Sequence, residues 1–342
     1  CILMDKKTTQ LHSFHESKNA KFIDFGDWSM PFSYEGTLKE HDVVRKSSGF
    51  FDVSHMGRLE INYSEIDKIS SLICSDLINI PLNKALYSIF TNENGNALDD
   101  VIFWKFEDKI ILIPNASNLS KIKSHLDKHN VDYLDKSQDT ILIAVQGPQS
   151  ISLLKERFDI PEKFCTNKTE SFLYARTGYT GEDGIEIMAN NNDADSLIKF
   201  LIEKGVSPCG LGSRDTLRLE ASLPLYGFEL TEDISPVEAS LSWTITNQQD
   251  YLGSDIIKTQ LSNGVHKSLQ KFTIDSRKIA RTDTIGISGD IKGTVTSGNF
   301  SPILNKSIGF ILFENKPSQD LIEFDIRGNL IEGNIVKKRF LN

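Results

Sequence analysis

A glycine-rich stretch that carries an aromatic ring and a carboxylate is the part of this sequence best suited to binding a ligand. It reads RTGYTGEDGIEI, occupies residues 176–187, and has a glycine at every third position. Glycines this dense indicate a turn in which the backbone takes unusual angles or lets another group approach closely. Tyr179 lies in the turn and Glu186 on the predicted strand that leaves it. The two can surround a flat, nitrogen-rich ligand, although a plain hairpin with a surface Tyr and a solvated Glu gives the same pattern.

The stretch does not predict a phosphate-binding loop. No Gly-Lys-Ser/Thr follows the glycines, and the turn carries Glu182 and Asp183 where a phosphate would need positive charge. We expect these two carboxylates to face water.

An acid pair and one histidine are further candidates for chemistry. Asp99 and Asp100 stand just before a predicted strand at 101–106, a position where an acid pair commonly ends a turn. His55 follows a short apolar run. Its spacing assigns it neither a nucleophile nor an orienting acid, so we expect a buried, hydrogen-bonded structural histidine.

The sequence contains no recognisable metal-binding pattern. His12 and His15 are three residues apart on a predicted helix, but no third ligand is near, and we expect exposed polar positions. The cysteines form no CxxC motif, which predicts free thiols in a reducing compartment and no structural zinc; they are Cys1, Cys74, Cys165 and Cys209.

Strands and helices alternate over the first two-thirds of the chain and must position these residues. The periodicity predicts strands at 58–62, 85–91, 101–106, 109–113 and 141–145, and helices at 37–48, 63–74, 117–129, 193–204 and 213–221. Short turns such as Asn94-Gly95 join many strand pairs, which favours an α+β fold with antiparallel sheets. From Lys267 onward, short strands and turn residues predict a separate all-β domain, with the boundary within 251–264.

Bulk composition places the chain among ordinary globular proteins. Its 342 residues predict two or three domains, and 39% are hydrophobic and 25% charged. The net charge of −9 argues against a dedicated nucleic-acid binder. No apolar run is long enough for a membrane span or a secretory signal, so we expect a soluble intracellular protein.

Six stretches together resemble one family, the aminomethyltransferases, or T-proteins, of the glycine cleavage system. They follow the family's order along nearly the whole chain, and each is long and low in degeneracy. They are FDVSHMG at 51–57, LDDVIF at 98–103, RTGYTGEDGIEI at 176–187, GLGSRDTLRLEASLPLYGFEL at 210–230, SPVEASLSW at 235–243 and GTVTSGNFSPILNKSIGF at 293–310.

The resemblance implies a three-domain cloverleaf of the α+β class around a central folate channel. Two α+β domains would contain mainly antiparallel sheets, and the third would be an all-β, barrel-like domain. The implied bounds are residues 1–57 plus 140–250 for a discontinuous folate-binding domain, 58–139 for an inserted domain carrying the catalytic aspartate, and 251–342 for the barrel-like domain.

The resemblance also implies an activity. T-proteins move the one-carbon unit of the aminomethyl group on the dihydrolipoyl arm of H-protein to tetrahydrofolate. Ammonia is released and 5,10-methylenetetrahydrofolate forms. The implied partners are lipoylated H-protein and tetrahydrofolate as co-substrate, without metal, nucleic acid or membrane. The implied location is the bacterial cytoplasm, or the mitochondrial matrix in a eukaryote.

Matching the family's motifs onto this chain implies seven site residues. The essential carboxylate of LDDVIF falls at Asp100, with Asp99 as the alternative, and Glu186 would hold the pterin ring. The remaining contacts with the ligand would come from Tyr179, Arg214 (with Arg218 as the alternative), Tyr87, Asn115 and Met56.

Two other functions remain open at this level. The first is a tetrahydrofolate-dependent demethylase of a small methylated compound, which shares the architecture but lacks the full FDVSHM and LDD strings. The second is a non-catalytic folate-binding module. Such modules carry a cysteine-containing loop in which none of Cys74, Cys165 or Cys209 is placed.

Overall fold

The computed structural model describes residues 6–341, which fold into two compact units. The first unit takes the chain up to Ile69 and the second the chain from Thr216 onward. The middle of the chain is shared: Leu77–Tyr87 and Val101–Asp215 belong to the first unit, and Ser70–Asp76 and Ser88–Asp100 to the second. The division into domains at 1–57 plus 140–250, 58–139 and 251–342 stays a prediction.

A six-stranded sheet forms the centre of the first unit, with the strand order β10-β11-β12-β9-β3-β13. All neighbours are antiparallel except the pair β3–β13. The strands are β3 (Gly49–Asp52), β9 (Thr140–Gln146), β10 (Thr166–Lys168), β11 (Phe172–Ala175), β12 (Gly184–Asn190) and β13 (Ser207–Pro208). The run at 141–145, predicted as a strand, lies in β9, where every residue is buried.

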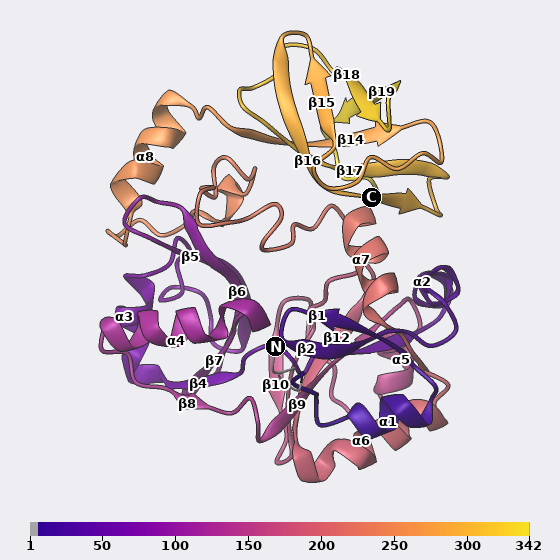
Figure 1. Ribbon diagram of the computed structural model, residues 1–342. Helices are drawn as coiled ribbons and strands as arrows, with labels where there is room; N and C mark the ends of the chain where they lie inside the picture. Colours follow the sequence, from indigo (N-terminus) through magenta and orange to yellow (C-terminus); the bar gives the residue numbers. More distant parts are fainter. Residues whose placement is uncertain (1–5, 342) are drawn as a thin grey trace. The chain divides into compact units, whose positions relative to one another are not determined.

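Helices cover this sheet and bury its apolar side chains. α5 (Ser150–Leu154) and α6 (Asn191–Glu203) both contact β12, at the lower right of Figure 1. Isoleucines of β9 and β12 pack with leucines of α6 in one core. β12, which carries Glu186, therefore has a strand on each side and helices against it, so its position is rigidly defined.

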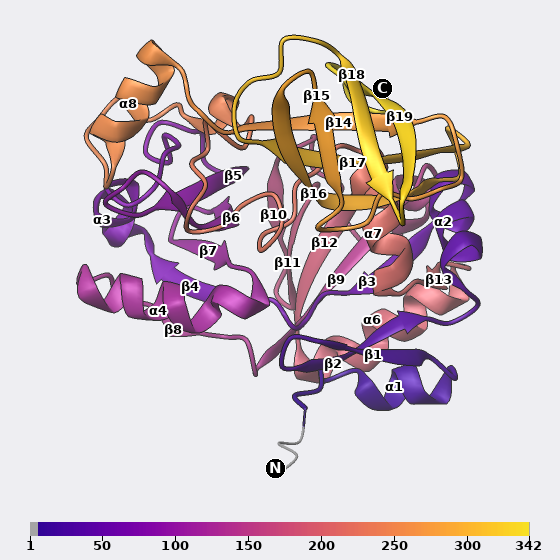
Figure 2. The same ribbon diagram turned by 45° about the horizontal axis from the view of Figure 1, so that its top comes forward.

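The remaining elements of the first unit include a hairpin beside a short helix. β1 (Lys21–Phe25) pairs with β2 (Trp28–Ser33), and Figure 2 shows this hairpin alongside α1 (His12–Ser17). The ring centroids of His12 and Phe22 are 4.8 Å apart there. α2 (Thr37–Lys46) ends two residues before the predicted end of that helix.

A five-stranded sheet follows the order β5-β6-β7-β4-β8. Its strands are β4 (Leu59–Asn62), β5 (Lys84–Thr91), β6 (Ala97–Lys105), β7 (Lys109–Ile113) and β8 (Leu134–Asp135), and its helical segments are η1 (Tyr63–Glu65), α3 (Ile66–Ser70), η2 (Ala116–Asn118) and α4 (Leu119–Lys128). β5 and β6 pass from one unit to the other.

The predicted start of β6 was wrong. The strand begins at Ala97, so Asp99 and Asp100 lie inside it and do not end a turn. Alternate residues of a strand share a face, and Asp99 shares its face with Val101 and Phe103, all three buried. The buried face of the later part of the strand thus extends back to a charged residue, Asp99. Strand propensity does not predict an aspartate at such a position.

The last part of the chain confirms the predicted all-β domain. Six strands close into a barrel with the order β14-β17-β16-β15-β18-β19 (Figure 2). They are β14 (Ser268–Ile274), β15 (Ile285–Ser288), β16 (Ile291–Ser301), β17 (Lys306–Phe313), β18 (Leu321–Ile326) and β19 (Asn329–Val336). The rings of Phe272 and Phe324 meet in its core, 4.6 Å apart. The segments α7 (Leu211–Glu220), η3 (Ser242–Thr244) and α8 (Ser254–Asn263) precede the barrel.

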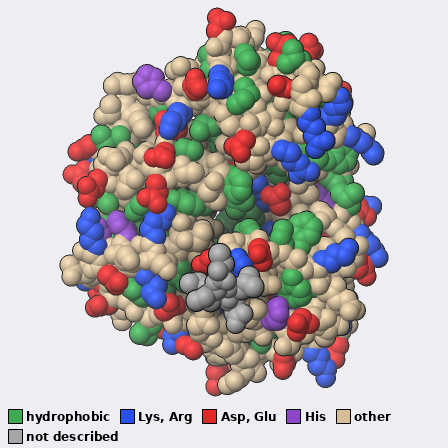
Figure 3. Space-filling model, viewed as in Figure 1, with side chains coloured by type: hydrophobic (Ala, Val, Ile, Leu, Met, Phe, Trp, Pro, Cys, Tyr) green, Lys and Arg blue, Asp and Glu red, His purple; other side chains and the backbone are tan. Residues whose placement is uncertain are grey.

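Charged side chains of both signs are spread over the face shown in Figure 3, with hydrophobic side chains among them. Some exposed apolar surface is normal for a globular protein. None of the helices described combines the length and the apolar character needed to cross a membrane.

Candidate functional site

The glycine-rich turn is held by two ion pairs, which the sequence-based prediction missed. Asp183 receives two bonds from Arg176, at 3.0 Å from Nε and 2.6 Å from Nη2. Glu182 accepts a 2.9 Å bond from Nη1 of Arg45, which also donates to the carbonyl of Thr180. The expectation that both carboxylates face water holds only in part: their side chains are 26% and 28% exposed, and each is bound by an arginine, one on α2 and one directly after β11.

Gln146, at the end of β9, holds the turn through two hydrogen bonds. Its Nε2 donates to the carbonyl of Thr177 and its Oε1 accepts from Oγ1 of Thr180, at 3.1 and 2.9 Å. A Cβ on Gly178 would lie 1.8 Å from the same Oε1, so only glycine allows this approach. The signal for Gln146 in the sequence was a polar residue directly after a fully apolar run.

Glu186 lies on β12 as predicted and is 5% exposed. Its Oε2 accepts a 2.6 Å bond from Oγ1 of Thr177, which orients the carboxylate. Its neighbours across the sheet are Ala175 on β11 and Ala144 on β9, and their small side chains leave room around the carboxylate. A buried carboxylate needs hydrogen-bond donors, and Thr177 supplies one of them.

Arg214 completes a cluster with Tyr179 and Glu186 in the first unit. Its guanidinium carbon lies 4.9 Å from the centroid of the Tyr179 ring and 5.9 Å from that of Phe51, within the range of cation–π attraction. Burial lowers the pKa of Arg214 below its ordinary value, against the opposing charges of Glu186 and Tyr179. Among the described residues, its buried Nη1 has no hydrogen-bond partner. The cluster therefore combines a buried cation that has an unused donor with a buried carboxylate.

Arg218, the alternative to Arg214, has a structural partner instead. Its Nη1 lies 2.9 Å from Oε2 of Glu229, and its Nη2 donates to Ser297 of the barrel. Both members of the ion pair are almost fully buried. Loss of either partner would leave a buried charge without its counter-charge, which destabilises the fold. Arg218 therefore stabilises the second unit.

Asp99 and Asp100 belong to the second unit and differ in accessibility. Asp99 is fully buried, whereas Asp100, on the opposite face of β6, is partly exposed. Asp100 is therefore the more accessible of the two carboxylates.

Three further predicted residues lie on other elements of the first unit. Tyr87 lies on β5, and Asn115 directly precedes η2. Met56 lies in the loop after β3, where its carbonyl accepts a bond from the buried guanidinium of Arg58. Arg58 also donates to the carbonyls of Ser54 and Thr140, both within 2.9 Å, and so holds the Met56 loop in one conformation.

His15 is buried, and the expectation of an exposed position was wrong. Its Nε2 lies 2.8 Å from Oδ2 of Asp52, and its Nδ1 lies 2.8 Å from the hydroxyl of Tyr34. Asp52 also accepts bonds from Thr9 Oγ1 at 2.6 Å and from the backbone nitrogen of Ser54 at 2.9 Å. This network, here called the Asp52 network, ties α1 to β3 and to the segment after β2.

The Asp52 network predicts a pH-dependent stability. Burial alone would raise the pKa of Asp52, but hydrogen bonds from His15, Ser54 and Thr9 and the charge of His15 lower it from 3.8 to about 2. The ionised carboxylate therefore stabilises the folded protein above about pH 4, and this contribution is lost as the pH falls towards 2. In urea titrations at pH 7, Asp52→Asn is expected to lower the free energy of unfolding by about 2 kcal/mol.

The difference between Asp52→Asn and the unsubstituted chain should shrink between about pH 4 and the acid limit of folding. Asp195→Asn, an exposed carboxylate on α6, is the control and should show no such dependence. A difference for Asp52→Asn that stays constant from pH 7 to pH 3 would contradict this assignment.

His55 is buried, as predicted, between the rings of Phe25 and Trp28. Its Nδ1, however, has no hydrogen-bond partner among the described residues. Burial lowers the pKa of His55 to about 4; the charge of Asp52 opposes this shift, and the charges of Arg214 and Arg58 add to it. The imidazole is therefore neutral at pH 7. No group of three His, Cys, Asp or Glu side chains suited to a metal ion occurs in the described part of the chain.

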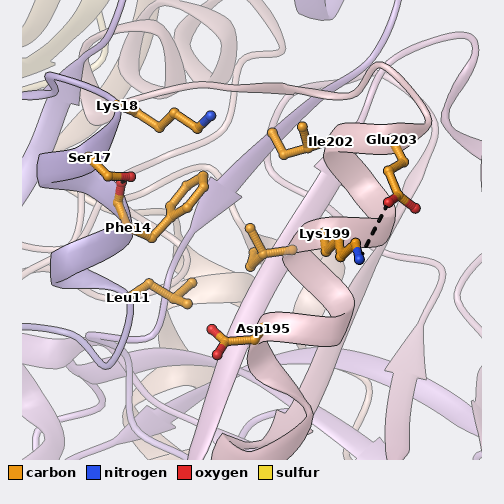
Figure 4. Close-up of a pocket in the computed structure, with 9 residues that line it drawn as sticks. Leu11, Phe14, Ser17, Lys18, Asp195, Lys199, Ile202 and Glu203 are labelled. Atoms are coloured by element: carbon orange, nitrogen blue, oxygen red, sulfur yellow. Dashed lines mark hydrogen bonds and ion pairs between the residues drawn. The ribbon is translucent and has the colours of Figure 1, made fainter.

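A cavity of about 470 Å³ lies elsewhere in the first unit, between α1 and α6 (Figure 4). Its lining is Leu11, Phe14, Ser17, Lys18, Asp195, Ile198, Lys199, Ile202 and Glu203. Apolar side chains face one another across it, and the Lys199–Glu203 ion pair runs along α6 with a separation of 3.9 Å. None of the predicted site residues lines this cavity.

Comparison with known proteins covers both parts of the chain. Residues 11–249 match the family model of the GCVT N-terminal domain, and residues 267–342 match that of the glycine cleavage T-protein C-terminal barrel domain. An aminomethyltransferase of Thermosipho melanesiensis is 38% identical over 353 residues, covering 98% of this chain and 97% of the relative. An aminomethyltransferase of Picosynechococcus is 36% identical over 357 residues, with 98% of each chain covered.

A solved structure agrees with these relatives. The crystal structure of the glycine cleavage system aminomethyltransferase T from Bartonella henselae is 28% identical, covers 98% of each chain, and superposes with a TM-score of 0.92. The matches extend over the α+β part and the closed barrel alike. On these grounds the chain belongs to the aminomethyltransferase, or glycine cleavage T-protein, family.

Proposed function

We propose that this protein is an aminomethyltransferase that moves a one-carbon unit from the lipoyl arm of H-protein to tetrahydrofolate. The observation that carries the proposal is the buried cluster of Glu186, Tyr179 and Arg214, set in a chain that matches aminomethyltransferases over 98% of its length. Membership of the family supplies the reaction, and the cluster supplies a place for the pterin ring.

The cluster suits a pterin in shape and in hydrogen bonding. A carboxylate can accept two parallel bonds from the pterin's amino group and the adjacent ring N–H. Glu186 is oriented for this by Thr177 and has small neighbours on both strands. The unused donor of Arg214 can reach a carbonyl oxygen of the same ring system, and the Tyr179 ring can pack beside it. We assign Met56, Tyr87 and Asn115 to further ligand contacts.

Asp100 is the proposed catalytic group. In the reaction, the S–CH₂–NH₂ group of the lipoyl arm gives its carbon to two nitrogens of tetrahydrofolate. One sulfur–carbon and one carbon–nitrogen bond break, two carbon–nitrogen bonds form, and the two protons of the folate nitrogens end on the released ammonia and thiol. A carboxylate near these nitrogens can orient the amine and carry a proton between the groups. The partial exposure of Asp100, against the full burial of Asp99, supports this choice.

Lipoylated H-protein is the proposed partner, and the proposed location is the cytoplasm of a bacterium, because the aminomethyltransferases compared are bacterial. Cys74, Cys165 and Cys209 are free thiols, as a reducing compartment favours.

The experiment that tests the function supplies purified protein with tetrahydrofolate and H-protein carrying the aminomethyl group. The expected result is one methylenetetrahydrofolate and one ammonia per aminomethyl group consumed. Parallel reactions with dimethylated amines and sulfonium compounds test the demethylase alternative. Product formed from those compounds, and none from loaded H-protein, would overturn the proposal.

A further inference from the structure

Lys84 and Cys165 form a side-chain pair that the transfer reaction does not use. Nζ of Lys84, at the start of β5, lies 2.9 Å from Sγ of Cys165, which precedes β10. The two residues are 81 positions apart in sequence and meet within the first unit. An amine and a thiol in such contact are a nucleophile and an oxidisable group within bonding reach.

The backbone explains why the side chains are so close. Lys84 and Cys165 are partners in an isolated antiparallel bridge. The hydrogen bonds on either side of the pair run from Ala85 N to Phe164 O and from Thr166 N to Asn83 O, both at 2.9 Å. Lys84 and Cys165 are therefore a non-hydrogen-bonded pair, the arrangement that brings opposite side chains closest in an antiparallel ladder.

The backbone of Cys165 is also held by its other neighbours. Its nitrogen donates to the carbonyl of Glu162, and its carbonyl accepts from the nitrogen of Arg176, at 3.0 and 2.9 Å. Phe164, directly before it, has a φ of 57°, a backbone angle that costs energy for any residue other than glycine. The thiol is thus kept beside the amine by a backbone that has little freedom to move away.

The pair is accessible to small reagents, unlike the other described cysteines. Lys84 and Cys165 are both partly exposed, whereas Cys74 and Cys209 are buried. The hydrogen bond to Cys165 raises the pKa of Lys84, so the amine is protonated while the sulfur is reduced. Oxidation turns the sulfur into a neutral sulfenic acid and removes that stabilisation, which favours release of the proton from the amine.

We propose that Lys84 and Cys165 form a reversible covalent cross-link when the protein meets a peroxide. In the first step hydrogen peroxide oxidises the thiol to a sulfenic acid, and one water leaves. In the second step the amine attacks the sulfur and displaces the hydroxyl as a second water, leaving an S–N bond. Two equivalents of a thiol reductant restore the thiol and amine and become a disulfide. This chemistry is independent of the aminomethyl transfer, although the link would restrain β5, the strand that carries Tyr87.

The test uses the full chain, treated with hydrogen peroxide, digested with trypsin and analysed by mass spectrometry. The expected product is one species that joins the Lys84 and Cys165 peptides, is uncut after Lys84, and is about 2 Da lighter than the reduced peptides together, since two hydrogens are lost. It should disappear after treatment with dithiothreitol. Cys74 and Cys209, which are buried, should stay reduced in the same digest.

Three variants test whether the cross-link requires both Lys84 and Cys165. Cys165→Ser and Lys84→Arg should lose the cross-link entirely, and Lys84→Arg should leave a sulfenic acid that dimedone traps, because arginine keeps the charge but does not condense. Lys163→Arg, two residues from Cys165 and exposed, should keep the cross-link. Oxidation of Cys165 in the unsubstituted chain to a dimedone-reactive or sulfinic form, with no joined peptide, would overturn the proposal. A link that persists in Lys84→Arg would do the same.

Discussion

Asp100→Asn is expected to lower the turnover of aminomethyl transfer by about 10²- to 10⁴-fold, the usual contribution of a positioned proton-transfer group. Asparagine has the same shape as aspartate but cannot take up a proton at neutral pH. The dissociation constant of tetrahydrofolate should change by no more than about twofold, because the interaction that is lost acts mainly in the transition state. Methylenetetrahydrofolate formation from loaded H-protein gives the first quantity and calorimetry the second.

Asp99→Asn is the matched comparison, since it changes the adjacent carboxylate on the opposite, buried face of β6. It is expected to affect stability more than turnover, because a buried acid contributes to packing and hydrogen bonding. Turnover that is normal in Asp100→Asn and lost in a folded Asp99→Asn would transfer the catalytic role to Asp99.

Glu186→Ala is expected to weaken tetrahydrofolate binding by about 1.5–3 kcal/mol, or roughly 10- to 100-fold in the dissociation constant. The pterin donors would lose a charged acceptor in a site where water replaces it poorly, and Thr177 would lose the acceptor at 2.6 Å. The cation of Arg214 would also lose the opposing charge of Glu186, which adds to the cost. Calorimetry with tetrahydrofolate measures the change.

Glu182→Gln is the matched control on the same turn. Its carboxylate lies in the ion pair with Arg45, and glutamine keeps an oxygen that accepts this bond. Binding should remain within about twofold of the unsubstituted protein, the range expected where no ligand contact is lost. An unchanged dissociation constant in Glu186→Ala, or an equal loss in Glu182→Gln, would place the pterin away from β12.

Much of the fold could be predicted from local patterns. The wholly apolar run in β9, the strand β7 and the turn-rich barrel sequence each show a period or a set of turn residues that is readable within a short window. α3 ends at Ser70, before the predicted helix end at residue 74, because the backbone that follows bonds to a distant segment: Cys74 N donates to the carbonyl of Ile89 and Thr91 N to that of Leu72. β6 begins earlier than expected because Asp99 is buried inside the strand by tertiary packing, although aspartate has a low strand propensity.

The pattern of the glycine-rich stretch pointed to Tyr179 and Glu186, and the resemblance was needed for Arg214 and for the role of each residue. Glu186, Tyr179 and Arg214 were named from motifs, and the structure brings these three together in the first unit. Thr177 and Gln146, which orient the carboxylate and hold the turn, were missed. Both are ordinary polar residues whose importance depends on partners far away in sequence.

The sequence by itself determined the class of fold, the family, and which acid of the glycine-rich turn lies on a strand, because periodicity, turn residues and long motifs are local properties. Only the tertiary structure decided the burial of His15 against Asp52, the ion pairs of Glu182 and Asp183, and the contact between Lys84 and Cys165. Each of these depends on which distant segments pair in a sheet or pack on it. Whether a charged side chain is solvated or buried depends on that pairing of distant segments. A short window of sequence does not contain the information about which segments pair.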